Sequence, residues 1–313
     1  MIQDRYLNPF TDFGFKKLFG TEANKDLLID FLNSLFQGEE VIKTLEFKKQ
    51  EQLGESELDR KAIFDLYCEN EKGEKFIIEL QKAKQKFFKE RTLFYATFPI
   101  QEQNQRGDWD YNLKAVYLVA ILDFIFDDDK TDPINYRYVV KLTDIETQKI
   151  FYDKLTFIYL EMPKFMKKGK ELVTHFDKWM YALKWLPSLV ESPDFLEEEI
   201  FKKLFQISAV QNLSPEEKEK YENSLKFYRD TKNVIDTARE EGKIEGEAIG
   251  LEKGKLEGKL EKSRATLRSL LQKKFKVVLS DEINQKIKTA ELDILDRWIE
   301  NIFDAESIEG LLR

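Results

Sequence analysis

The sequence predicts an α/β domain followed by an all-helical C-terminal region. Two helical patterns come first, three strand-length apolar segments follow within residues 41–80, and a further helical pattern precedes the strongly apolar segment 114–124. This alternation is typical of a sheet covered by helices. Beyond Pro163, the periodic segments have the spacing of helices.

The first 38 residues are expected to form two helices. Thr11 or Asp12 can cap the first helix, whose apolar residues repeat up to Gly20. Asn24 can cap the second helix, which carries apolar residues at helical spacing and ends at Gly38.

The expected strands are short and apolar, and they cover residues 41–49, 62–68, 75–80, 114–124, 136–142 and 156–160. The fourth strand is almost wholly apolar, so it should be central and covered on both faces, and the last two should lie nearer an edge. A helix with a basic N-terminal half is expected over residues 82–105, and Pro99 should kink or split it.

The turn between the second and third strands sets their pairing. Residues 70–73 (NEKG) are typical of a type I turn closed by a glycine bulge. A three-residue loop at 71–73 produces a register that places Asp65 directly opposite Glu79.

The C-terminal region is expected to be helical, with helices at 175–186, 195–210, 215–232 and 234–275 and two short amphipathic helices within 280–313. The long helix holds an internal repeat, a glycine at every fourth position from Gly242 to Gly258. Four parts are therefore expected: a domain over 1–165, a helical region over 166–233, the glycine-repeat helix over 234–275 and a helical tail over 276–313.

Composition excludes several classes of protein. Cys68 and His175 are the single cysteine and histidine, which excludes an intrachain disulfide, a multi-cysteine zinc site and a paired-histidine metal site. The net charge of −8 argues against a surface that binds nucleic acid everywhere but allows a local basic strip. No apolar run is long enough to span a bilayer and no signal peptide is evident, so we expect a cytoplasmic protein without membrane contact.

Asp65 and Glu79 are the residues that point to chemistry. Two carboxylates that face each other across a strand pair repel, and Asp65 lies among apolar residues. A divalent cation between them would supply the missing countercharge. Gln81 lies two residues beyond Glu79, on the same face of the strand. The alternative is a solvated hairpin whose acids pair with lysines.

Two motifs resemble a known family. The runs from Asn8 to Gly20 (NPFTDFGFKKLFG) and from Phe64 to Gln81 (FDLYCENEKGEKFIIELQ) resemble the recombination-promoting nuclease and putative transposase family of the PD-(D/E)XK nuclease superfamily. The resemblance covers roughly the first two-thirds of the chain. It implies an α/β restriction-endonuclease-like core, a mixed sheet flanked by helices, with the glycine-repeat helix as a C-terminal extension.

The resemblance also implies a Mg²⁺-dependent DNA endonuclease that promotes recombination or transposition, with Mn²⁺ as the other candidate ion. The superfamily's aspartate corresponds to Asp65, its second acid to Glu79 and its lysine position to Gln81. Phe64 replaces the proline that precedes the aspartate. Because an amide is uncharged and takes no proton, Gln81 can only orient the attacking water. Accessory positions fall at Asp12, Lys16 and Tyr95. Asp12 is expected to act as a helix cap, and the alternative is a third acid near the metal.

A basic strip begins directly after the acids, and its members are Lys82, Lys84, Lys86, Lys89 and Arg91. We expect them to bind the DNA backbone at the mouth of the site. The alternative is a solvated helix face.

The glycine-repeat helix should pack against another helix. Its apolar residues follow an eleven-residue rhythm that gives a nearly straight stripe: Ile249, Leu256, Leu260, Leu267 and Leu271. We expect a homo-oligomer formed through the C-terminal helices, or packing against the chain's own helices. The alternative is a flexible charged linker.

Two other functions compete with the endonuclease. One is a catalytically weak DNA-binding or protein-interaction module that keeps the nuclease fold, and Gln81 is the residue that favours it. The other is an RNase-H-like transposase, which is disfavoured because its acids lie on separated strands rather than on one short hairpin.

Overall fold

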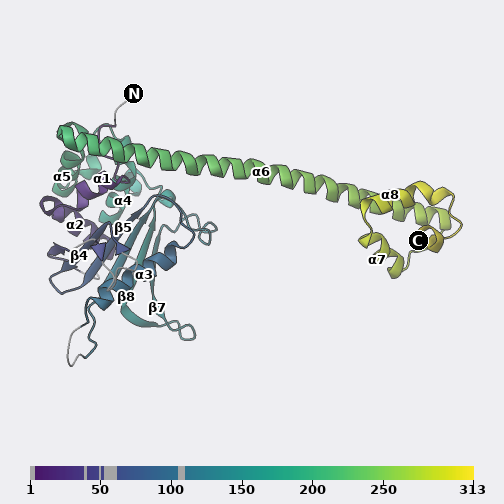
Figure 1. Cartoon of the computed structure of the whole chain (residues 1–313), viewed down its shortest axis with the longest axis horizontal. Helices are drawn as coiled ribbons and strands as arrows, with labels where there is room; N and C mark the ends of the chain where they lie inside the picture. The colour runs from purple at the N-terminus through teal and green to yellow at the C-terminus, as the bar shows by residue number, and fades with distance from the viewer. Residues whose placement is uncertain (1–3, 39–40, 49–50, 53–61, 105–109) are drawn as a thin grey trace. The chain divides into compact units, whose positions relative to one another are not determined.

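The computed structural model describes residues 4–38, 41–48, 51–52, 62–104 and 110–313 (Figure 1). The chain divides into two compact units, Met1–Ile235 and Asp236–Arg313. The four-part division expected from the sequence stays a prediction.

A six-stranded mixed sheet forms the centre of the N-terminal unit. In spatial order its strands are β1 (Leu45–Phe47), β4 (Leu66–Asn70), β5 (Lys75–Gln81), β6 (Val116–Leu122), β8 (Ile150–Glu161) and β7 (Arg137–Thr143). Strands β5, β6 and β8 are parallel, and the outer pairs are antiparallel. As predicted, β6 is central and buried along its whole length, and β7 lies at an edge. Strands β2 (Glu51–Gln52) and β3 (Ala62–Ile63) form a separate pair.

Helices cover both faces of this sheet (Figure 1). The larger core lies under α1 (Asp12–Phe19), α2 (Lys25–Phe36), α4 (His175–Trp185) and α5 (Glu199–Ser208). On the opposite face, α3 (Phe88–Gln101) packs on a smaller core. A long helix, α6 (Pro215–Phe275), follows. This arrangement confirms the predicted fold class.

Short 3₁₀ helices connect these elements at Glu22–Asn24, Met162–Lys164, Gly169–Glu171, Leu186–Ser188, Asp194–Leu196 and Val210–Asn212. Among the helices of the described residues, none combines the length and the apolar character that crossing a bilayer requires.

The β4–β5 hairpin closes as the sequence predicts. The Asn70 N–H donates to the Glu74 carbonyl at 3.1 Å, the Gly73 N–H donates to the Asn70 carbonyl at 3.0 Å, and Gly73 has a φ of 80°. Leu66 therefore pairs with Ile78, and extending this register by one residue sets Asp65 opposite Glu79.

The expected strand over residues 62–68 is wrong in its middle, because β3 ends at Ile63 and β4 begins at Leu66. The Asp65 carboxylate accepts the Leu80 N–H at 2.7 Å, so a side chain takes the place of a backbone acceptor there. The first strand is also shorter than expected, since β1 covers only Leu45–Phe47.

The helix expected from residue 82 is wrong in its first part, because α3 begins at Phe88. The Gln81 side-chain amide donates to the Ala83 carbonyl at 2.7 Å, which occupies an acceptor that a helix would use. Pro99 does not split α3, which continues to Gln101. The helices expected over 215–232 and 234–275 form the single helix α6.

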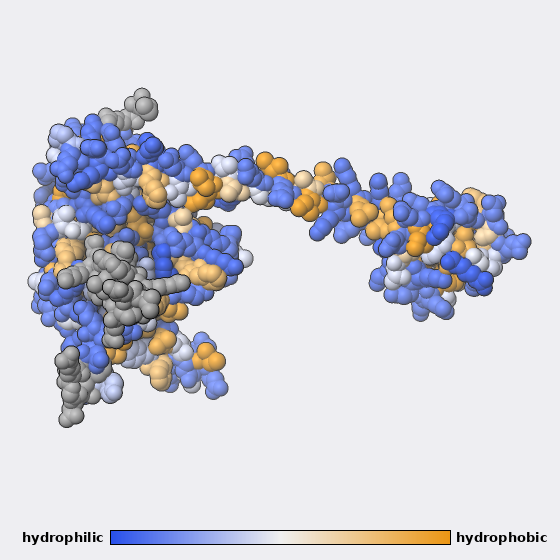
Figure 2. Space-filling view, viewed as in Figure 1, coloured by the Kyte–Doolittle hydropathy of each residue, from blue (hydrophilic) through white to orange (hydrophobic). Residues whose placement is uncertain are grey.

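The C-terminal unit has its own core. The last part of α6 packs there with α7 (Asp281–Thr289), α8 (Leu292–Glu300), a 3₁₀ turn at Asn301–Phe303 and α9 (Ile308–Leu311). Leu267 and Leu271 of the predicted stripe are buried in this core, whereas Ile249 and Leu256 are exposed. Apolar residues are accordingly visible on the surface of α6 (Figure 2).

Changing Gly73 to alanine should destabilise the N-terminal unit by about 1–2 kcal/mol, because an L-residue is strained at positive φ. The added Cβ would come no closer than 3.5 Å to its nearest neighbour, a carbon of Lys114, so the cost comes from the backbone alone. Gly73→Asn is the matched control, since asparagine tolerates this conformation better. Urea denaturation measures both variants, and an equal loss for alanine and asparagine would contradict the account.

Candidate active site at the end of strand β5

Glu79 and Gln81 lie on the α3 face of β5. Their neighbours Ile78 and Leu80 belong to the core on the opposite face, as strand alternation requires. Glu79 is only 5% exposed. Gln81 is the last residue of β5, and it contacts Arg91 from α3.

Asp65 joins Glu79 from the bend before β4. The Asp65 N–H donates to Oε1 of Glu79 at 3.3 Å, and Oδ2 of Asp65 accepts the Leu80 N–H at 2.7 Å. The hairpin register and these two hydrogen bonds therefore bring both carboxyl groups to one place.

Burial and like charge raise the pKa of both members of the pair. Burial raises the pKa of Asp65, and the nearby Asp12 carboxylate raises it further, although the hydrogen bond from Leu80 opposes the change. Burial and the charge of Asp65 raise the pKa of Glu79 to about 8, against the opposing charge of Arg91. A proton on Glu79 thus relieves at neutral pH the repulsion that a cation would otherwise relieve.

Asp12 approaches this pair from α1. Thr11, not Asp12, caps the helix: its Oγ1 accepts the Gly14 N–H at 3.0 Å. The expectation that Asp12 is the cap is therefore wrong. Asp12 binds Lys16 at 3.1 Å one turn later, and both charges act on Asp65.

Lys82 follows directly after β5 and lies within range of the same acids. Burial lowers the pKa of Lys82, while the charges of Asp12 and Asp65 raise it. Its ammonium also lies 5.7 Å from the ring centre of Phe227 in the first part of α6. The expected site did not include α6, because a contact between residues so distant in sequence leaves no local pattern.

The other basic residues do not form one helix face. Lys84 pairs with Asp127, and Lys89 lies 3.1 Å from Asp128. The Lys86 ammonium lies 5.3 Å from the ring centre of Phe87. Part of the expected DNA-binding charge is thus paired with the acidic loop after β6. Parallel pairing of β5 with β6 puts the ends of both strands side by side and explains this contact.

Arg91 reaches the acids from the first turn of α3. Its Nη2 donates to Oε1 of Gln81 at 2.6 Å and lies 3.9 Å from Oε2 of Glu79. Its Nη1 donates to Gln85 at 2.5 Å, a residue that was absent from the expected site. Tyr95 lies one turn further on, where burial and the charge of Glu79 raise its pKa.

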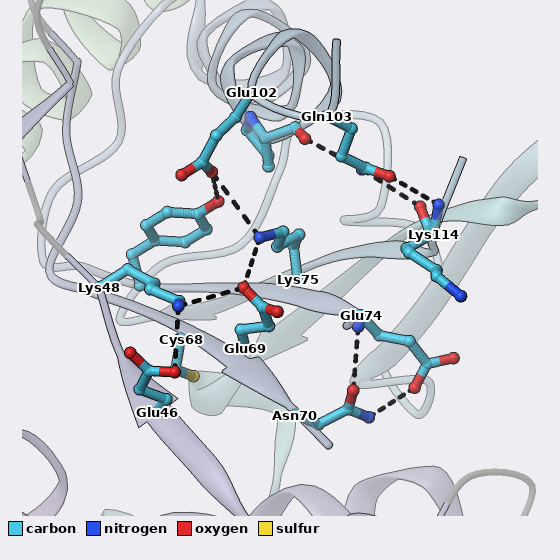
Figure 3. Close-up of polar contacts among 12 residues, drawn as sticks. Glu46, Lys48, Cys68, Glu69, Asn70, Glu74, Lys75, Glu102, Gln103 and Lys114 are labelled. Carbon is cyan, nitrogen blue, oxygen red and sulfur yellow. Dashed lines mark hydrogen bonds and ion pairs between the residues drawn. The ribbon is translucent and has the colours of Figure 1, made fainter. Parts of the chain in front are cut away.

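A polar cluster fixes the far end of α3 to the sheet (Figure 3). Glu102, directly after α3, accepts a hydrogen bond from the Tyr67 hydroxyl and lies 4.0 Å from the Lys75 ammonium. Lys75 also donates to Glu69 of β4 at 2.5 Å, and Lys48 lies 3.3 Å from the same carboxylate. Strands β4 and β5 therefore hold the helix that carries Arg91.

The donor set fits a hard divalent cation. Asp65 and Glu79 provide carboxylate oxygens, and Mg²⁺ is commonly bound by one or two carboxylates while it keeps several waters. Within the described residues, no cluster of three or more His, Cys, Asp or Glu side chains could hold a metal. The fit therefore rests on two acids with water and substrate completing the coordination.

Glu79→Gln should change how the stability of the metal-free protein depends on pH. Between about pH 4.5 and pH 8 the unfolded chain loses the Glu79 proton before the folded chain does, so the free energy of unfolding of the wild type falls as pH rises. Glutamine does not titrate, so the variant lacks this decrease. The free energy of unfolding of the variant minus that of the wild type should therefore be larger at pH 8 than at pH 5, as measured by urea denaturation with EDTA.

Glu146→Gln, at an exposed residue, is the matched control. It should change the free energy of unfolding by the same small amount at pH 5 and at pH 8. A constant difference between Glu79→Gln and the wild type across this pH range would show that folding does not raise the pKa of Glu79.

Comparison with known proteins places this chain in a family. No curated protein and no solved structure matches the chain. The family model described as PD-(D/E)XK nuclease family transposase matches residues 9–238, which include the sheet, the acid pair and both motifs except Asn8. The chain therefore belongs to the PD-(D/E)XK nuclease family transposases.

Proposed function

We propose that this protein is a Mg²⁺-dependent DNA endonuclease that hydrolyses phosphodiester bonds in the cytoplasm and thereby promotes recombination or transposition. One observation carries the proposal: the half-buried Asp65 and the buried Glu79 meet near the end of β5, where burial and repulsion raise the pKa of Glu79. Family membership supports a nuclease-like function and a divalent metal.

In the proposed mechanism Asp65 and Glu79 hold the cation, with Mn²⁺ able to replace Mg²⁺. The cation would lower the pKa of the attacking water and neutralise charge on the phosphate. Water then forms a new P–O bond, one ester P–O bond breaks, and the leaving oxygen takes up a proton. The proton lost by the water passes to solvent, since the Gln81 amide cannot take it.

For Gln81 we propose a different role from the one expected. Its Oε1 accepts from Arg91 and its Nε2 donates to the Ala83 carbonyl, so both polar atoms of the amide already have protein partners. These contacts favour a role in holding Arg91 over a role in orienting water.

The proposed DNA-binding residues are Lys82, Lys84, Lys86, Lys89 and Arg91, with Lys16, Asp12 and Tyr95 at the edge of the site. Lys84 and Lys89 must exchange Asp127 and Asp128 for phosphates, which lowers the net gain from each contact. Affinity should therefore be sequence-independent and strongly salt-dependent.

Gln81 also supports the second candidate, a catalytically weak DNA-binding or protein-interaction module. The absence of the superfamily's lysine removes a charge that nucleases of this class use. The two candidates differ in one observable, metal-dependent cleavage.

Plasmid cleavage tests the proposal directly. The wild type should cleave supercoiled plasmid in the presence of Mg²⁺ but not in the presence of EDTA. Asp65→Ala and Glu79→Ala should each lower the rate by more than about 100-fold, because each removes half of the cation's protein ligands.

Glu146→Ala, which removes an exposed carboxylate on the β7–β8 turn, should cleave like the wild type. Metal-independent nicking, or equal nicking by all three variants, would leave the binding module as the better account.

We also propose that the exposed part of α6 associates with a second copy of the chain. A Cβ added at any glycine from Gly242 to Gly258 would meet nothing within 4 Å, so these positions leave room for another helix. Five glycines cost about 5 kcal/mol of helix stability relative to alanine. Close approach of another helix over Ile249 and Leu256 would offset this cost, and pairing two active sites would allow double-strand cleavage.

Replacing Ile249 and Leu256 together with glutamate should lower the oligomer mass in light scattering, because the apolar contact would bury two charges. Val278→Glu is the control, since Val278 is 93% exposed and lies outside the stripe. A monomeric wild type, or a double variant with unchanged mass, would refute the association.

A further inference from the structure

The Arg91 guanidinium lies beside the acid pair with most of its charge uncancelled. Gln81 and Gln85 accept its two hydrogen bonds, and both are neutral amides. Among the described residues, Glu79 is the acid nearest to it, at 3.9 Å. Lys84 and Lys89, by contrast, pair directly with aspartates.

The guanidinium is also held in place. Its central carbon lies 4.8 Å from the ring centre of Phe88 and 5.5 Å from that of Tyr95, so aromatic rings of α3 pack against it. The buried Nε has no hydrogen-bond partner in the described part of the chain. The side chain nevertheless remains 27% exposed, so a phosphate can reach it.

We propose that Arg91 supplies the fixed positive charge that the lysine of the PD-(D/E)XK motif would supply, and that Gln81 positions it. This inference rests on the proposed function. It moves Arg91 from the group of DNA-backbone contacts to the site of reaction, and it explains why an amide can stand at the lysine position.

The two cations differ in the chemistry they allow. A guanidinium stays protonated, so Arg91 cannot take the proton of the attacking water. Its planar donors suit two oxygens of one phosphate, and it can stabilise negative charge that develops in the transition state. Arg91 should therefore affect the rate of cleavage far more than the affinity for DNA.

Arg91→Met tests this role in the full chain. We expect the single-turnover cleavage rate to fall about 100-fold. Duplex affinity should change by less than about 3-fold, and its salt slope should stay the same, whereas loss of a backbone phosphate contact would lower that slope by about 1. Arg91→Lys should recover part of the rate, because it restores a cation.

The swap Gln81→Lys with Arg91→Gln should restore cleavage to within about 10-fold of the wild type, because it returns the charge to the motif position. Arg229→Met is the matched control, since Arg229 pairs with Asp4 on the surface, away from the acids.

A second measurement needs no cleavage. Binding of Mn²⁺ alone, followed by calorimetry, should be about 10-fold tighter in Arg91→Met than in the wild type, because a neighbouring cation has been removed. Unchanged or weaker binding would overturn the role of Arg91, as would a variant that loses DNA affinity and cleavage equally. A wild type that binds Mn²⁺ but never cleaves would refute the proposed function, while the Mn²⁺ comparison would still show whether the charge of Arg91 acts on the cation site.

Discussion

The antiparallel pairing of β4 with β5 is the interaction on which the site depends. The glycine at the turn fixes which residues face each other, and that register forces Asp65 against Glu79. A shift by one residue would turn Glu79 towards the opposite core and leave no acid pair. The surrounding sheet and helices keep this register, because they bury both faces of β5.

Charged residues from several elements of the fold surround this pair. The α1 residues Asp12 and Lys16, the strand end at Lys82 and the α3 residue Arg91 all act on the same two carboxyl groups. The cluster around Glu102 fixes α3 to the sheet, and Gln81 and Gln85 hold the Arg91 guanidinium. The site therefore combines two neighbouring acids with the cationic side chains of Lys16, Lys82 and Arg91.

Local patterns predicted much of this. The NEKG turn predicted the register, alternation predicted the face of Gln81, and an apolar run predicted the central strand β6. The pairing of Lys84 with Asp127 could not be predicted, because it joins segments that only the parallel sheet brings together. The predicted start of α3 was wrong for a local reason, because the side-chain contacts of Gln81 compete with helix formation.

Anomalous diffraction from crystals soaked in Mn²⁺ tests the central claim most directly, because it locates the cation without relying on activity. The account predicts a peak between Asp65 and Glu79, about 2.1–2.3 Å from one carboxylate oxygen of each. A peak elsewhere, or a lysine or arginine side chain seated between the two carboxylates with no metal bound, would contradict it.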